Sequence, residues 1–201
     1  MSSTPTTKQR IVYAAADLFR RHGYAGTGMR QVVAAAQAPF GSLYHHFPGG
    51  KEQLGEEVIR VAGGMYGELV AAILDSGPDD LVAATEQAFA LAAQHLEQSG
   101  WEDACPIATI ALEVASTSEP MRIASAEVFE RWFAALAGRF SAAGIAPESA
   151  RELALTWLML LEGGFLFCRA ARTREALHVA GRQAAAAVAA ALPPAAAPSR
   201  T

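Results

Sequence analysis

The fold of this chain is decided by residues 27–51, which read Thr27-Gly-Met-Arg-Gln-Val-Val-Ala-Ala-Ala-Gln-Ala-Pro-Phe-Gly-Ser-Leu-Tyr-His-His-Phe-Pro-Gly-Gly-Lys51. Thr27 is a good N-cap for a short helix whose apolar residues recur at helical spacing. Gln37 and Ala38 form a turn, and Pro39 opens a second short helix that extends to about Phe47. Two short helices joined by a turn of three or four residues have the spacing of a helix-turn-helix.

The second of these helices carries more polar groups than a core helix needs. Ser42, Tyr44 and His45 have hydroxyls and an imidazole that can bond phosphate oxygens. Gly41 lacks a side chain, which allows close approach of the backbone to a partner. Lys51 is badly placed for the dipole of the helix that it begins, and a phosphate partner would explain it. These features predict that the stretch binds DNA.

The adjacent histidines suggest different roles. His46 precedes the apolar Phe47 and is expected to be structural, whereas His45 is expected to face DNA. We expect no metal site at this pair, because neighbouring residues on a helix point about 100° apart.

Charge is divided unevenly along the chain. The net charge is −4, yet residues 1–51 hold six lysines and arginines against Asp17 alone, a net +5, which leaves −9 for residues 52–201. A basic head on an acidic body suits a polyanion bound at one end only.

The remainder of the chain predicts an all-α protein. Apolar residues make up 52% and charged residues 18%, alanine is abundant, and strand signals are scarce. Apolar periodicity and Gly or Pro breaks predict further helices at about 7–22, 51–74, 80–98, 106–115, 119–143, 147–171 and 173–191, the last capped by Thr173. The expected organisation is a three-helix helix-turn-helix domain at 1–50, a connecting helix at 51–75, a helical bundle for ligand binding and dimerisation at 76–192, and a disordered tail at 193–201.

Residues 7–55 resemble the TetR family of transcriptional regulators. The residues that match its N-terminal pattern are Thr27, Val32, Val33, Ala36, Gly41, Leu43, Tyr44, His46, Phe47, Lys51 and Leu54. The run Gly-Ser-Leu-Tyr-His-His-Phe-Pro-Gly-Gly-Lys and the later stretch 103–113 resemble the subgroup of LmrA/YxaF-type multidrug-resistance repressors. The resemblance implies that the second helix is a recognition helix in the major groove, and that Thr27, Tyr44, His45 and Lys51 contact phosphates.

The chain departs from the family pattern at the turn. Where the family usually has Gly-Val-Ser, this chain has Gln37-Ala38-Pro39, which removes the residue best able to adopt a positive φ and a polar cap. Phe40 stands where the family often has a basic or polar residue, and we expect it to pack on a thymine methyl or a sugar. Arg30 either reads a base or supports its helix at the surface, and Gln37 either touches DNA or does nothing. The expected DNA-binding residues are Thr27, Arg30, Gln37, Pro39, Phe40, Gly41, Ser42, Tyr44, His45 and Lys51.

The two C-terminal helices predict a homodimer. The first is bulky and apolar nearly all round, more than one core face needs, and the second is rich in alanine. The surplus face is expected to meet a second subunit through Leu153, Leu160, Leu161, Gly164, Phe165, Ala184 and Val188. A monomeric bundle is the alternative.

The middle helices offer residues for a ligand cavity. The aromatic and apolar candidates are Phe89, Trp101, Ile107, Ile110, Phe129, Trp132, Phe133 and Trp157, and the polar ones are His95, Thr109, Glu113 and Glu162. Each polar group is either a ligand contact or a satisfied buried group. A mostly apolar cavity suits a small apolar or aromatic effector.

The sequence carries no pattern for a metal or cofactor, and none is expected. Cys105, before Pro106 at a helix start, is either a redox sensor or a small buried residue, and Cys168 is expected in the core. The most apolar stretch, 153–168, is interrupted by Glu162 and is shorter than the roughly 20 residues of a membrane span. We therefore expect no membrane contact, no secretion signal and a cytoplasmic location.

Together these features predict a repressor, not an enzyme, that binds a palindromic operator of double-stranded DNA as a dimer. A small-molecule effector would release it by favouring a pose of the helix at 51–74 that gives the two heads the wrong spacing. The alternatives are a DNA-binding regulator without a ligand, a redox-responsive regulator, and a small helical enzyme, for which no catalytic motif is present.

Overall fold

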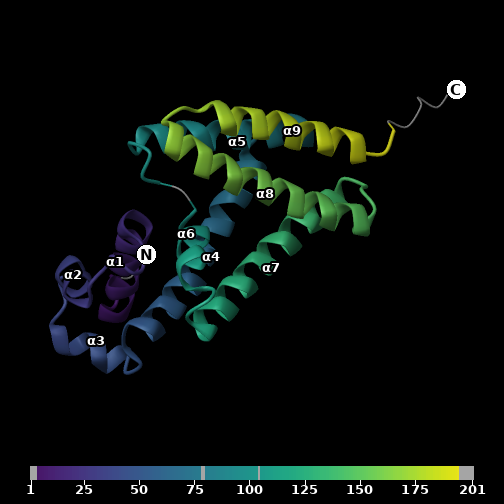
Figure 1. The fold of residues 1–201 in the computed structure, drawn as a ribbon. Helices are drawn as coiled ribbons and strands as arrows, with labels where there is room; N and C mark the ends of the chain where they lie inside the picture. Colours follow the sequence, from purple (N-terminus) through teal and green to yellow (C-terminus); the bar gives the residue numbers. More distant parts are fainter. Residues whose placement is uncertain (1–3, 78–79, 104, 195–201) are drawn as a thin grey trace, which may run out of the picture. The chain divides into compact units, whose positions relative to one another are not determined.

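The computed structural model describes residues 4–77, 80–103 and 105–194. Figure 1 shows the elements, which are α1 (Thr7–His22), α2 (Met29–Ala35), α3 (Phe40–His46), α4 (Gly50–Ser76), α5 (Leu81–Gln98), α6 (Pro106–Val114), α7 (Glu119–Ala142), α8 (Pro147–Ala171) and α9 (Glu175–Ala191). The fold is all-α as predicted, and no strand occurs in these ranges. The tail predicted at 193–201 lies outside the described residues from 195 onward.

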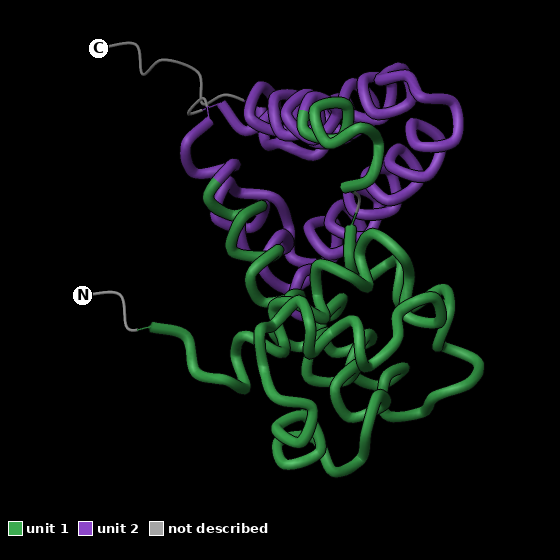
Figure 2. Tube along the Cα trace, turned by 90° about the vertical axis from the view of Figure 1, so that its left-hand side faces the viewer, with its two compact units in different colours: residues 1–72, 95–130 green, residues 73–94, 131–201 purple. Residues whose placement is uncertain are grey.

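The chain packs as two compact units that do not follow chain order. Unit 1 comprises residues 1–72 and 95–130, and unit 2 comprises residues 73–94 and 131–201 (Figure 2). Helices α4, α5 and α7 each contribute residues to both units. Unit 1 therefore contains α6 together with the helix-turn-helix.

The core of unit 1 begins with α1. Its N-cap, Thr6, accepts a hydrogen bond from Gln9 N–H while the Gln9 side chain accepts one from Thr6 N–H, which closes a capping box. The helix then buries the apolar residues Ile11, Val12, Ala15 and Phe19 against α2 and α3. Burying such side chains contributes about 1.5–3 kcal/mol each, so this face fixes the three N-terminal helices as one body.

Unit 2 is built on the antiparallel pair α8 and α9, which run side by side in Figure 1. Two glycines, which have no side chain, allow close packing of α8 on α9 and of α9 on α5. A Cβ at Gly164 would meet Leu177, and a Cβ at Gly181 would meet Phe89. Phe89 in turn packs edge-on against Trp157, with ring centroids 4.9 Å apart.

Helix α8 is longer than the apolar stretch seen in the sequence. Its 25 residues are long and apolar enough to cross a membrane by length and composition, and 44% of its most apolar window is buried inside the protein. The buried residues recur at helical spacing along one side, as in a core helix. They are Ala150, Leu153, Ala154, Trp157, Leu158, Leu161, Gly164, Phe165 and Cys168.

Three predicted helix starts are shifted. The N-cap of α2 is Gly28, not Thr27, and the N-cap of α9 is Arg174, not Thr173. Pro39 is the N-cap of α3 and not its first residue. Threonine was predicted at the start of α2 and of α9 because it is a common N-cap residue. The Thr27 hydroxyl does not cap α2, because it donates to Leu18 O and Gly23 O of the preceding segment.

Candidate nucleic-acid interface and effector site

The turn between α2 and α3 is held by the backbone of α2. Gln37 N–H donates to Ala34 O at 3.1 Å, and Ala38 N–H donates to Val33 O at 3.0 Å. Gln37 adopts a φ of +50°, the left-handed conformation that glycine adopts most easily. The turn therefore keeps the geometry of a glycine turn without the glycine, and Gln37 carries the backbone strain.

Helix α3 has one buried and one exposed side. Leu43 and Phe47 are 0% and 1% exposed, as their spacing predicts. On the outer side, Phe40 is 46% and Tyr44 50% exposed, and their rings pack edge-on with centroids 5.6 Å apart. His45 is also exposed, whereas His46 is half-buried against the ring of Phe47.

The other predicted DNA-binding residues fall into two groups. Arg30, Gln37, Pro39 and Gly41 are exposed, and Ser42 is half-buried. Thr27 is 1% exposed, and its hydroxyl donates to Gly23 O at 2.8 Å and Leu18 O at 3.3 Å. Thr27 thus holds the corner between α1 and α2, and a phosphate contact would require its hydroxyl to leave these carbonyls.

Lys51 lies against the α1–α2 turn. Its Nζ stands 4.5 Å from the centroid of the Tyr24 ring and donates to Ala25 O at 3.5 Å. Burial lowers the pKa of Lys51, and the nearby Glu113 carboxylate opposes that shift. The positive charge of Lys51, unfavourable at the N-terminus of α4, is therefore partly stabilised by a cation–π contact with Tyr24 of the same chain.

Glu113 of α6 also binds this turn. Its carboxylate accepts hydrogen bonds from the backbone N–H groups of Tyr24 at 3.0 Å and Ala25 at 2.8 Å. These are two donors that follow the end of α1 and have no helical acceptor. Glu113 was predicted to be either a ligand contact or a satisfied buried group, and in the structure its carboxylate connects α6 to the helix-turn-helix.

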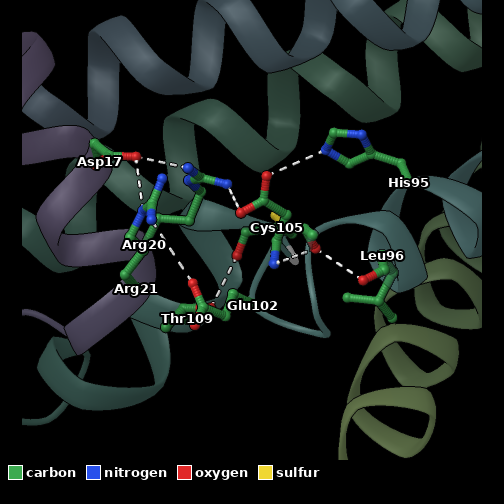
Figure 3. Close-up of polar contacts among 10 residues, drawn as sticks. Asp17, Arg20, Arg21, His95, Leu96, Glu102, Cys105 and Thr109 are labelled. Atoms are coloured by element: carbon green, nitrogen blue, oxygen red, sulfur yellow. Dashed lines mark hydrogen bonds and ion pairs between the residues drawn. The ribbon is translucent and has the colours of Figure 1, made fainter. Parts of the chain in front are cut away.

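A second polar cluster of unit 1 links α1 to the segment before α6 (Figure 3). Arg20 bridges Asp17 on its own helix and Asp103, while Arg21 reaches Glu102 at 3.7 Å. His95 Nε2 lies 3.2 Å from the other oxygen of Asp103, and the His95 side chain is 67% exposed. This predicted ligand residue is therefore a surface partner of Asp103.

Cys105 caps α6. The thiol is 1% exposed, and its sulfur accepts a hydrogen bond from Ala108 N–H at 3.4 Å. The Thr109 hydroxyl donates to Cys105 O at 3.0 Å, so this predicted ligand group also serves the first turn of α6. Cys168 is 0% exposed, as expected, and accepts from Leu177 N–H at 3.3 Å. Among the residues described, no three His, Cys, Asp or Glu side chains group to hold a metal ion.

The remaining ligand candidates divide between the two units. In unit 1, Ile107 and Ile110 are fully buried, while Trp101 and Phe129 are half-buried. In unit 2, Phe89 and Trp157 form the aromatic pair, Trp132 is 7% exposed, and the half-buried ones are Phe133 and Glu162.

Among the buried polar atoms of unit 2 in the described ranges, the Thr85 hydroxyl oxygen and the Trp157 Nε1 have no hydrogen-bond partner. Thr85 lies one turn before Phe89 on α5, hence on the same side of that helix. Leaving such groups unsatisfied costs about 1–3 kcal/mol each. Thr85 does not stand out in the sequence as a ligand candidate, because a β-branched residue in an apolar stripe suggests a core residue.

The residues predicted for dimerisation lie inside unit 2. Leu153, Leu161, Phe165, Ala184 and Val188 are at most 7% exposed, Gly164 is buried under Leu177, and Leu160 is half-buried. The apolar side chains that α8 exposes are instead Met159 (64%), Leu166 (60%) and Phe167 (64%), with Val179 (42%) on α9. These exposures show which side of α8 its own chain covers, which a helix that is apolar all round does not reveal in its sequence.

Comparison with known proteins agrees with this architecture. Residues 11–58 match the family model of bacterial regulatory proteins of the tetR family, and residues 82–183 match the C-terminal domain of LmrA/YxaF-like transcriptional regulators. The chain is 32% identical to the uncharacterized HTH-type transcriptional regulator YxaF of Bacillus subtilis, over 83% of this chain and 86% of that one. It is 31% identical to the HTH-type transcriptional regulator LmrA of the same species, over 86% and 92% of the two chains.

Solved structures give the same fold. The regulatory protein TetR from Rhodobacter sphaeroides superposes with a TM-score of 0.78 at 22% identity, covering 90% of this chain and 98% of that one. The relatives are transcriptional regulators and not enzymes. This chain belongs to the TetR family of DNA-binding helix-turn-helix transcriptional regulators, in its LmrA/YxaF-like group.

Proposed function

We propose that this protein is a repressor that binds a roughly palindromic operator as a homodimer and releases it when a small apolar or aromatic molecule binds. The observation that carries the DNA-binding part is the outer side of α3. It exposes Phe40, Tyr44 and His45 on a basic head, in a helix whose opposite side is fully buried. Such a helix suits the major groove, and the surrounding hydroxyl and cationic groups suit phosphates. This function would be exercised in the cytoplasm of a bacterium.

The exposed apolar side of α8 supports the homodimer. Met159, Leu166 and Phe167 are each at least 60% exposed, which costs free energy in water. Met159, Gly163 and Leu166 recur at helical spacing and form one side of α8. We assign this side, with Val179 of α9, to a second copy of the chain, which would set two α3 helices about 34–36 Å apart on DNA.

Unit 2 supports the response to an effector. The rings of Phe89 and Trp157 provide an apolar surface, and the unpartnered Trp157 Nε1 and Thr85 hydroxyl can bond a polar group of the ligand. Apolar lining with a few polar groups is typical of small-molecule sites. The ligand would favour a conformation in which the heads have the wrong spacing, and a preference of a few kcal/mol is enough to weaken operator binding substantially.

The test is fluorescence-anisotropy binding to a duplex selected by this protein from a random library, at several salt concentrations. We expect tight binding that weakens steeply with salt, and strong loss in Tyr44→Phe/Lys51→Ala. Arg122→Ala is the matched control, because it removes an exposed cation from α7 and should leave binding unchanged. Equal weak binding by all proteins to every duplex would contradict the proposal. A thermal-shift screen without any stabilising compound would favour a regulator that needs no ligand.

A further inference from the structure

Helix α3 begins with an aromatic side chain that its own fold does not bury. Phe40 is the first residue of the helix and is 46% exposed. Its ring contacts that of Tyr44, one turn later and itself 50% exposed, so the two rings share the outer side of α3. A partner that covers Phe40 would gain the free energy of removing this apolar surface from water.

Gly41 is the second unusual feature of the same turn. A Cβ added there would meet no atom of the chain within 4 Å, and its φ is not in the left-handed region. The fold therefore does not require glycine at this position, and alanine would favour the helix. The missing side chain matters only to something that approaches α3 from outside.

The first turn of α3 also lacks the side chains that bond guanine or adenine through two hydrogen bonds at once. Its residues are Phe40, Gly41, Ser42 and Leu43, without an arginine, lysine, asparagine or glutamine. In the major groove, the apolar group that distinguishes one base from the others is the 5-methyl of thymine, which aromatic and aliphatic side chains contact.

We propose that Phe40 and Gly41 form a thymine reader: the ring of Phe40 covers the 5-methyl group of one thymine in each half-site, and the bare Gly41 lets α3 approach that base. This inference rests on the DNA-binding function proposed above. Tyr44 holds the Phe40 ring through their edge-on contact.

The test replaces each thymine of the selected duplex, one at a time, with deoxyuridine, which removes only the methyl group. For the wild-type protein we expect about a fourfold loss of affinity at one symmetric pair of positions, because one buried methyl is worth about that much, and little change elsewhere. Phe40→Ala should bind more weakly to the normal duplex and lose the sensitivity at that pair. Phe40→Leu keeps an apolar contact and should retain part of it.

The variant Gly41→Ala tests the role of Gly41 independently of Phe40. We expect this variant to unfold at a higher denaturant concentration than the wild type, yet to bind the duplex more weakly, because its new methyl group occupies the space of the DNA. Unchanged DNA affinity in Gly41→Ala would overturn the role of Gly41.

The outcomes distinguish the thymine reader from the DNA-binding function. Tight, salt-dependent binding with no deoxyuridine position that matters would overturn the thymine reader and leave the DNA-binding function intact. Loss of affinity in Phe40→Ala with full deoxyuridine sensitivity would also overturn it, and would place the ring on a sugar instead. Failure to enrich any duplex would overturn both.

Discussion

The carboxylate of Glu113 occupies the place that a side chain on Gly23 would take, so it would have to move for any other residue there. A Cβ on Gly23 would collide with the Glu113 carboxylate, and Gly23 has a φ of +75°. The same carboxylate accepts hydrogen bonds from the backbone N–H groups of Tyr24 and Ala25. The end of α1 and the side chain of α6 are therefore fitted to one another within unit 1.

Replacing Glu113 with alanine should lower the free energy of unfolding by about 1–2 kcal/mol, because two backbone donors lose their acceptor. Glu113→Gln keeps one acceptor oxygen and should lose about half as much. Chemical denaturation measures both. Glu119→Ala, which removes an exposed partner of Arg122 on α7, should leave the denaturation midpoint close to that of the wild type. Equal effects at Glu113 and Glu119 would show that the Glu113 contact contributes nothing.

Gln37→Gly should stabilise the protein by about 0.5–1 kcal/mol. Glycine adopts the left-handed conformation of residue 37 without steric strain. Part of this gain is lost, because glycine also raises the conformational entropy of the unfolded chain. Gln37→Val should destabilise it, because a β-branched residue tolerates this conformation least. Denaturation midpoints of the two variants test this, and a Gly variant less stable than the wild type would contradict it. Operator affinity, measured in parallel, shows whether the glutamine side chain also contacts DNA.

Thr85→Val should raise the stability of the ligand-free protein by about 1 kcal/mol, because it removes a buried hydroxyl without a partner and keeps the shape. Trp157→Phe removes the unpartnered N–H but also leaves a small void, so its effect on the free protein should be near zero or unfavourable. In thermal-shift titrations, both variants should gain less stability from an effector than the wild type gains. An undiminished gain in both would exclude these two atoms from the ligand site.

Leu166→Glu/Phe167→Glu should yield a monomer in sedimentation experiments, because two charges would replace the apolar side chains assigned to the partner. Leu112→Glu is the control, as Leu112 on α6 is 84% exposed. That variant should sediment like the wild type. If both proteins remained dimeric, a different face would have to join the subunits.

Acid should loosen the contacts of α1 around Asp17. Burial raises the pKa of Asp17, but hydrogen bonds from Arg20 and Arg21 outweigh it, and the net pKa is lowered. A carboxylate with a lowered pKa stabilises the fold above its unfolded pKa and loses that contribution as the pH falls through the folded value. Asp17→Asn should therefore lose stability at neutral pH and show a flatter acid limb when unfolding is followed against pH. An acid limb identical to that of the wild type would contradict this role.

Helix positions followed well from the sequence because local signals fix them. The helix start near Thr7, the Gly and Pro breaks between helices, and Pro106 at the start of α6 all match helix ends that the structure has. The inward positions of Leu43 and Phe47 followed from their four-residue spacing. Long-range contacts did not follow, since nothing near Glu113 or His95 in the sequence indicates Tyr24, Ala25 or Asp103 as partners.

The orientation of α8 shows another limit of sequence patterns. Its apolar residues surround the helix, so periodicity cannot distinguish the side that covers α9 from the side that remains exposed. Leu161 and Leu166 look equivalent in the sequence, yet the structure leaves 2% of the first and 60% of the second exposed.

The membership of α6 in unit 1 bears on protein engineering. Regulators of this kind invite chimeras in which the DNA-binding head of one protein is joined to the sensor of another, with the junction at the start of α4. In this chain such a junction would separate the turn at Tyr24 and Ala25 from Glu113, and Arg20 from Asp103. The exchangeable module is therefore unit 1, residues 1–72 together with 95–130, and grafts that carry both segments should retain the fold of the head.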